Sequence, residues 1–434
     1  MSRTAGDIHP GSVAGASRRR ERTALVVWTL LIAGSFAVGA VLHGLGLLTI
    51  DHLPPLHALF RVLTVTLLPA ALFAIVAVRA LPRLVAGGGF GRASLVAYGF
   101  ALAWTVLLAI SADGLAAPFT HQQEYLAVLP AVGHDPLGWL ASFTERLPEY
   151  PTHVRGHPPL PVLVVWALAA AGLPGPLPAA ILVVALGCSA TVAIGLTVRR
   201  LAGEEAARRA LPYLALTPAS VWIATTMDAF FAGVGAWGVA LLVLGRSTRS
   251  RACFAAAGGV LLGALPYLSY GLVPYLLIPV VVAVLVRLPR PAMAAAMVGA
   301  AAVTAAFAAG GFLWPAGVVA THAEWAADPG AARPYLYFLV ANLAVLALLT
   351  GPAAAVGLVR AAHERNAVAI VVAAALVAVL ALDVSGVTRG EVERIWLPFA
   401  LWIGPAAALA PGRRMLAAQA VTGLLLQALV ASPW

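Results

Sequence analysis

Two carboxylates stand where long apolar runs meet polar segments, a setting in which a carboxylate can act as a general base. Glu124 lies shortly after the apolar run 93–112, and Asp228 directly precedes the run 229–245. Each also has an ordinary explanation. Glu124 can be a solvated first-turn acid favoured by a helix dipole, and Asp228 can form a capping box with Thr225.

His157 directly precedes Pro158 and Pro159, and Arg155 stands two residues before His157. Proline in the first turn of a helix is common, so helix initiation alone accounts for the prolines. An arginine and a histidine beside a helix N-terminus can in addition face an anion, because the free backbone N–H groups carry partial positive charge. We therefore interpret this segment as a candidate site for a phosphate.

A second charged segment, residues 389–394, lies against another apolar run and contains Arg389, Glu391 and Arg394. It can be a surface ion-pair network that contributes little, or it can bind a phosphate or pyrophosphate. Tyr270 lies in an outer turn, where an aromatic belt is the default explanation, and we include it as a candidate contact to substrate.

The composition indicates a membrane protein: 62% of the residues are hydrophobic, 10% are charged and the mean hydropathy is +0.94. The net charge of +10 comes from 27 arginines clustered between apolar runs, which favours a membrane over nucleic acid as the partner. Cys188 and Cys253 stand far apart with no histidine at ligand spacing. We predict no disulfide, no structural zinc site and no cofactor, and the sequence leaves dependence on a divalent metal open.

Apolar runs of about 17 to 25 residues are long enough to cross a bilayer as helices. The predicted crossings are 24–46, 57–78, 93–112, 178–198, 210–224, 229–245, 252–269, 271–287, 292–310, 335–358, 367–382, 395–410 and 415–431. The run 158–173 is shorter and begins with prolines.

The arginines decide whether 158–173 crosses, because cytoplasmic loops accumulate basic residues. If it does not cross, 21 of the 27 arginines lie inside; if it does, 11 lie inside. We therefore predict an all-α polytopic protein of the cell membrane with about 13 transmembrane helices, a cytoplasmic N-terminus and an extracytoplasmic C-terminus. The run 158–173 becomes a re-entrant or interfacial helix, which membranes tolerate where it packs on protein.

The chain divides into four predicted regions: a disordered tail 1–23, a helical pair with linker 24–92, a module 93–290 and a C-terminal transmembrane module 291–434. The module 93–290 contains a large first outer loop, 113–177. Its polar part, Asp113–His157, holds five of the 17 acidic residues and four of the ten histidines.

Over 93–290 the order of motifs resembles the GT-C superfamily of polytopic glycosyltransferases. The matching pieces are Glu124 early in the first outer loop, His157-Pro158-Pro159-Leu160, Arg199–Gly203, and Pro218 to Asp228. The chain shows His-Gln-Gln-Glu where that family often has paired acids, and Leu160-Pro161-Val162 where it has aromatic residues. The segments G-H-P-P and R-G-E-V-E-R-I-W are similar to those of actinobacterial membrane proteins.

The resemblance implies inverting transfer of a sugar from a polyprenyl-phosphate donor to an envelope glycan, lipid or protein acceptor. Glu124 would be the base, with Asp228 as the second catalytic carboxylate, while Arg155, His157, Arg389 and Arg394 would neutralise the leaving phosphate. A transporter or flippase of a lipid-linked sugar is the first alternative, and it predicts charged residues near the middle of the membrane. A non-catalytic scaffold in envelope assembly is the second.

Overall fold

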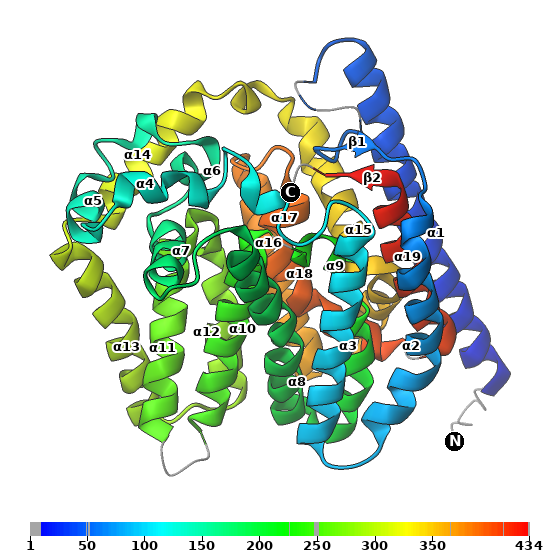
Figure 1. The fold of residues 1–434 in the computed structure, drawn as a ribbon. Coiled ribbons are helices and arrows are strands. Elements are labelled where there is room, and N and C mark those ends of the chain that lie inside the picture. The colour runs from blue at the N-terminus through cyan, green and yellow to red at the C-terminus, as the bar shows by residue number, and fades with distance from the viewer. Residues whose placement is uncertain are drawn as a thin grey trace, which may run out of the picture.

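The computed structural model describes residues 10–48, 50, 53–224, 226–246, 251–364, 366–410 and 412–432, with side chains from Arg18 onward. Nearly all of this is helix (Figure 1). Within the described residues, nine helices are long and apolar enough to cross a membrane. The prediction of an all-α polytopic membrane protein is confirmed at this level.

The nine long helices account for most of the predicted crossings. They are α1 (Pro10–Gly44), α2 (Leu68–Ala86, extended by a 3-10 turn from Val65), α3 (Phe90–Ile110), α8 (Pro176–Ala215), α10 (Met227–Leu244), α11 (Arg251–Leu268), α13 (Arg290–Ala309), α15 (Tyr335–Glu364) and α16 (Ala367–Ser385). The other four predicted crossings correspond to the second part of α8, the apolar segments Tyr270–Leu285 and Leu397–Leu409, and α19 (Arg413–Leu429). None of these four makes a separate helix of 18 residues, so the number 13 stays a prediction.

Two helices begin at residues other than those predicted. Helix α1 starts at Pro10, within the tail 1–23 that we predicted to be disordered; residues 1–9 lie outside the described residues. The second crossing runs over Val65–Ala86 instead of 57–78. It starts later because Leu59–Phe60 (β1) pair antiparallel with Val430–Ala431 (β2), and Pro69 then occupies the first turn of α2.

The run 158–173 forms a short helix, α7 (Leu160–Ala170). Its 11 residues extend about 16 Å at 1.5 Å per residue, roughly half of a bilayer core. It packs against α4 (Leu129–Val132) in the outer loop, where the Trp166 indole N–H donates to the Gly133 carbonyl at 3.0 Å. This length and packing agree with a helix that does not cross.

Small residues set the closest helix contacts. Gly259 and Gly263 on α11 face the α13 backbone at Ala296 and Ala300, and Gly299 on α13 faces Ala256; a Cβ at any of these glycines would overlap its neighbour. Small residues allow such close approach between helices in lipid. The Ala-rich α13 is thereby fixed to the bundle.

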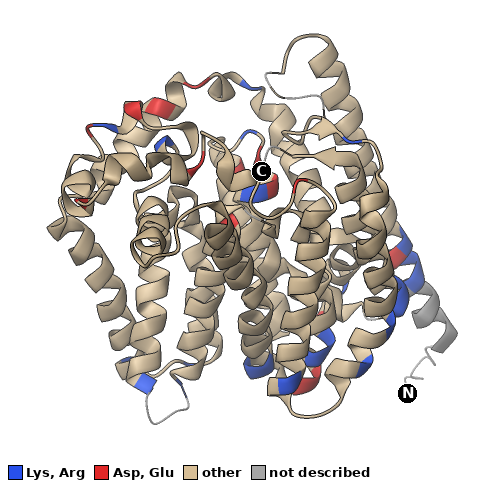
Figure 2. Ribbon diagram, in the orientation of Figure 1, with Lys and Arg blue, Asp and Glu red and all other residues tan. Residues whose placement is uncertain are grey.

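The described ends of the chain lie at opposite ends of the bundle. Helix α1 runs from Arg18 at one end to Gly44 at the other, and β2 pairs with β1, which follows α1 (Figure 1). Arginines gather at the end where α1 starts, whereas most acidic residues lie at the opposite end (Figure 2). We call these the basic end and the acidic end.

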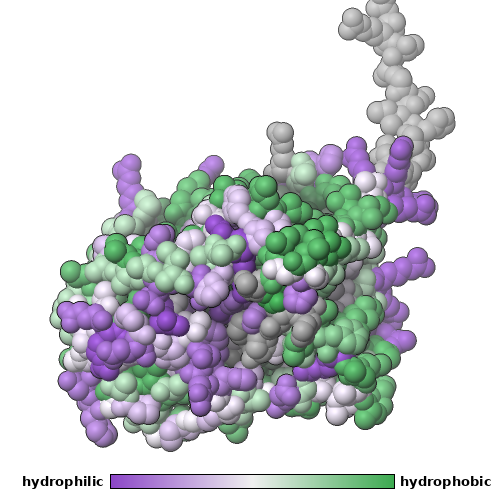
Figure 3. Space-filling view, turned by 90° about the horizontal axis from the view of Figure 1, so that it is seen from above, coloured by the Kyte–Doolittle hydropathy of each residue, from purple (hydrophilic) through white to green (hydrophobic). Residues whose placement is uncertain are grey.

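The acidic end carries the large loop between α3 and α8. This loop is folded into short helices: η2 (Pro118–Thr120), η3 (Tyr125–Val128), α4, α5 (Pro136–Ser142), η4 (Leu147–Glu149), α6 (Thr152–Arg155) and α7. Later segments join it there: α14 (Trp314–Ala327), η7 (Pro329–Ala332) and α17 (Val392–Ile395), whereas α9 (Ser220–Ile223) lies deeper in the bundle, against α3, α8, α10 and α19. Seen from this end, hydrophilic side chains gather over the face, and hydrophobic ones predominate along parts of its edge (Figure 3).

Candidate active site

Glu124 and His153 form a hydrogen-bonded pair inside the large loop. Glu124 precedes η3 in extended conformation, and His153 belongs to α6. The Gln123 side chain accepts from the Thr152 N–H at 3.0 Å, which joins the two parts of the loop. His153 Nδ1 lies 2.8 Å from Glu124 Oε1, and both side chains are only 11% exposed. Because a carboxylate accepts, Nδ1 is the donor, and the imidazole fixes the orientation of the carboxylate.

His157 points inward, next to this pair. Its Nδ1 donates to the His153 carbonyl at 2.8 Å, and its ring packs on Tyr125 at 5.9 Å and Phe231 at 6.0 Å between ring centroids. Burial lowers the pKa of His157 to about 4, although Asp228 acts in the opposite direction. The imidazole is therefore neutral near pH 7. The positive charge that we expected it to present to an anion is absent.

Arg394 on α17 contacts two carboxylates from different segments. Its Nη1 lies 3.4 Å from Asp228 Oδ2, and its Nη2 lies 3.0 Å from Glu391 Oε2. The side chains of Arg394 and Asp228 are 8% and 6% exposed. Burial acts to lower the pKa of Arg394, but Asp228 and Glu391 hold it above its ordinary value.

The capping-box explanation for Asp228 does not describe the start of α10. Thr225 lies outside the described residues, and the N-cap of α10 is Thr226. The Thr226 hydroxyl donates to the Trp222 carbonyl instead of capping the helix. Asp228 is thus a buried first-turn acid whose partner is Arg394.

Glu391 and Glu393 add two further carboxylates beside α17. Glu391 has a left-handed backbone, with φ of 60°, and lies 3.6 Å from Arg333. Burial acts to raise the pKa of Glu391, but Arg394 and Arg333 together hold it below its ordinary value. Glu393 is buried and accepts from the backbone N–H of His57 at 3.3 Å.

These residues make one group, which we call the buried cluster. Its members are Glu124, Tyr125, His153, His157, Asp228, Glu391 and Arg394, of which Glu391 is the most exposed at 28%. Charge links its two halves, since Asp228, Tyr125 and Glu124 all act on the pKa of Arg394. Carboxylates outnumber arginine in it, so a phosphate would have to compete with carboxylates for Arg394.

Three predicted binding residues have their partners elsewhere. Arg155 contacts Glu324 on α14 at 3.2 Å. Arg389 donates to the carbonyls of Gly386 and Arg333, both at 3.0 Å, and so ties its own loop to the segment that precedes α15. The Tyr270 ring packs on Trp314 of α14 at 5.9 Å. Arg155 and His157, which we expected to face one anion, point in different directions here: Arg155 turns to α14 and His157 into the cluster.

Our reading of the sequence missed His153 and Tyr125. His153 stands four residues before His157, a spacing that places two side chains on the same side of a helical turn. Tyr125 follows Glu124 directly, but the sequence gives no sign that its ring closes over His157.

Chemically, the buried cluster offers a carboxylate held by an imidazole, a neutral histidine, and an arginine between two acids. Within the described part of the chain, no three His, Cys, Asp or Glu side chains are grouped so as to hold a metal ion. This set suits proton transfer to and from hydroxyl groups. Comparison with protein-family models, with curated proteins and with solved structures finds no match to this chain.

Proposed function

We propose that this protein is a GT-C-type glycosyltransferase that moves a sugar from a polyprenyl-phosphate donor to an envelope glycan, lipid or protein acceptor, with inversion. The observation that carries the proposal is the meeting of Glu124 and Asp228, far apart in sequence, in one buried cluster with Arg394 beneath the large loop. The resemblance of the motif order to GT-C enzymes supplies the substrate class.

In this mechanism Glu124 accepts the proton of an acceptor hydroxyl while His153 holds its carboxylate in place. The hydroxyl oxygen bonds to the anomeric carbon from the face opposite the phosphate. The bond from that carbon to the phosphate oxygen breaks, and polyprenyl phosphate leaves with the electron pair. Arg394 stabilises the charge that grows on this oxygen, with Asp228 and Glu391 setting the position of its guanidinium.

We place the acidic end outside the cell and the basic end in the cytoplasm. The gathering of arginines at one end (Figure 2) supports this orientation, since basic residues are retained on the cytoplasmic side. The buried cluster then lies near the extracytoplasmic face, where envelope acceptors are found.

The positions of charged residues support a transferase over a transporter. In the described parts of the nine long helices, charged side chains lie within the first or last two turns or beside the kink at Gly203. Transport sites for charged substrates are built near the middle of the membrane, where these helices carry apolar side chains.

The test is sugar transfer by the purified full chain with polyprenyl-phosphate sugars as donors. We expect Glu124→Gln to lower the rate by about 10² to 10⁴, the usual contribution of a general base, and Asp228→Asn to lower it as well. Glu324→Gln is the matched control, because this acid lies in the same outer region but pairs with Arg155, and it should keep most of the activity.

Two results would contradict the proposal. Full activity of Glu124→Gln would remove Glu124 as the base. Absence of transfer by the wild-type protein with every donor, together with movement of the lipid-linked sugar across proteoliposomes, would favour the transporter.

A further inference from the structure

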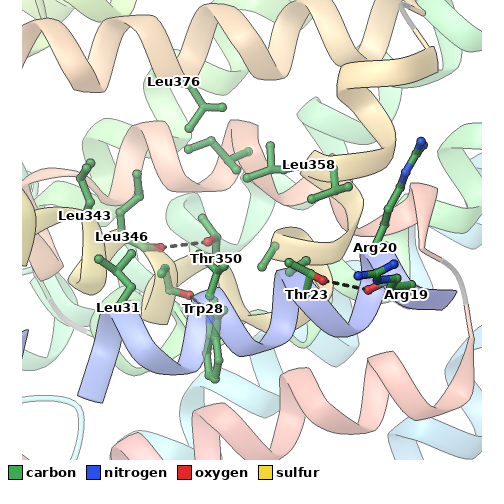
Figure 4. Close-up of a pocket in the computed structure, with 16 residues that line it drawn as sticks. Arg19, Arg20, Thr23, Trp28, Leu31, Leu343, Leu346, Thr350, Leu358 and Leu376 are labelled. Atoms are coloured by element: carbon green, nitrogen blue, oxygen red, sulfur yellow. Dashed lines mark hydrogen bonds between the residues drawn. The ribbon is translucent and has the colours of Figure 1, made fainter. Parts of the chain in front are cut away.

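A groove runs along the flank of the bundle between α1 and α15, with α16 and the end of α18 (Leu397–Ile403) behind it (Figure 4). Its volume is about 540 Å³. Apolar side chains form most of its walls, among them Val27, Leu31, Leu346 and Leu358. Such a groove suits a hydrocarbon chain rather than a sugar.

Contacts within the protein hold the walls of the groove together. The Trp28 indole N–H donates to the Ala347 carbonyl at 2.9 Å, which ties α1 to α15 within the groove. Few other segments cover α1, because only 11% of the residues in its apolar stretch are buried. The groove therefore faces the side of the bundle on which lipid would lie.

The length of the groove matches one leaflet. On α1 it extends from Arg19 to Leu31 (Figure 4), and 12 residues of helix rise about 18 Å. Half of a bilayer core is about 15 Å thick. An acyl chain that enters beside Arg19 would thus reach the middle of the membrane near Leu31.

The mouth of the groove is positively charged. Arg19 and Arg20 line it and are exposed, and no ion pair joins either of them to a described carboxylate. The nearby Glu21 is instead paired with Arg360. Two arginines at a membrane surface attract anionic lipid headgroups.

We propose that this groove binds an acyl chain of an anionic glycerophospholipid, with Arg19 and Arg20 holding its headgroup phosphate. The site is separate from the buried cluster, because Arg19 belongs to the part of α1 at the basic end and Arg394 belongs to α17, which lies at the acidic end (Figure 1). The lipid is accordingly a resident of the basic-end leaflet and not the sugar donor.

The test is native mass spectrometry of the delipidated full chain titrated with phosphatidylglycerol or with phosphatidylethanolamine of the same acyl chains. We expect tighter binding of phosphatidylglycerol. Replacing Arg19 and Arg20 with alanine should weaken that binding by about fivefold for each arginine. Arg290→Ala is the matched control, an exposed arginine at the start of α13 that does not line the groove.

A second pair of variants tests the groove itself. Val27→Trp fills it from an exposed position on α1 and should lower the binding of both lipids. Val41→Trp, at an exposed position of α1 outside the groove, should not. Thermal unfolding of each variant checks that the bundle is intact.

Equal binding of the two lipids, or the same loss in Arg290→Ala as in the Arg19 and Arg20 variant, would overturn the assignment of an anionic headgroup. Binding that does not respond to Val27→Trp would mean that the lipid binds outside the groove, and would overturn the proposal. Tighter binding of a polyprenyl phosphate than of phosphatidylglycerol would make it a donor site instead.

Discussion

Arg394 and Arg155 both pair with a carboxylate at the acidic end, yet they lie in opposite surroundings. Arg394 and Asp228 are 8% and 6% exposed, whereas Arg155 and Glu324 are 36% and 27% exposed. Burial changes the consequence of the same chemical pairing, because a charge removed from water depends on its partner far more than a hydrated charge does.

The two pairs also join different parts of the fold. The Arg394 pair connects α17 with the first turn of α10 and lies next to Glu124 and Tyr125. The Arg155 pair fastens α14 to the end of α6, where the Thr321 hydroxyl also donates to the Arg155 carbonyl at 3.3 Å. The first pair is part of the candidate active site, and the second attaches α14 to the large loop.

Replacing Arg394 should lower the stability of the protein more than replacing Arg155. Arg394→Met leaves the buried Asp228 without its cation, and the loss of one partner from a buried pair costs about 3 to 5 kcal/mol. We expect a correspondingly lower unfolding temperature in detergent micelles, together with loss of sugar transfer.

The double variant Arg394→Met with Asp228→Asn serves as the control. It removes both charges of the pair, so it should recover part of the stability lost in Arg394→Met without restoring transfer. If Arg394→Met lowers the free energy of unfolding by less than about 1 kcal/mol, the range of surface pairs, the Arg394 pair is solvated. It then does not differ from the Arg155 pair.

His157 tests the burial of the cluster through pH. Its pKa in the folded chain is about 4, against 6.5 for an exposed histidine, so the unfolded chain binds more protons between these values. Stability should therefore be complete above pH 6.5 and fall as the pH drops toward 4, by about 3 kcal/mol from this residue.

The measurement is the unfolding temperature of the wild type and of His157→Phe across pH 4 to 7. Phenylalanine keeps the ring packing on Tyr125 and Phe231 but cannot titrate, so the variant should lose much of the dependence on pH in this window. An unchanged slope would mean that His157 is hydrated in the folded protein.

The sequence predicted the helical class and most of the long helices, because the apolar runs are long and the charged residues mark their ends. It also named Glu124, Asp228, Glu391 and Arg394, which the structure brings together. The composition of the chain explains this success, since charged residues are so few that those near the ends of apolar runs are conspicuous.

Pairing between distant segments could not be predicted in the same way. Arg155 and His157 stand two residues apart, but the turn at Gly156 sends one side chain toward α14 and the other inward. The delayed start of α2 depends on β2, some 370 residues later in the chain. The local sequence pattern carries no information about partners that lie far away in the chain.

The smallest effect is expected for Arg155. Arg155→Met should change stability by at most about 1 kcal/mol, because a partly exposed pair gains little from its charge and is screened by salt. Sugar transfer should stay close to that of the wild type if Arg155 only fastens α14. A double-mutant cycle with Glu324→Gln measures the coupling between the two side chains.

Raising the salt concentration separates the two arginine pairs further. The Arg155 coupling should shrink as salt rises, whereas the Arg394 pair, shielded from solvent, should respond little. A large loss of transfer in Arg155→Met at unchanged stability would reverse the interpretation of this region. It would indicate that Arg155 binds the donor phosphate, the role that the sequence suggested. Helix α14 would then close over bound substrate instead of only packing on the loop.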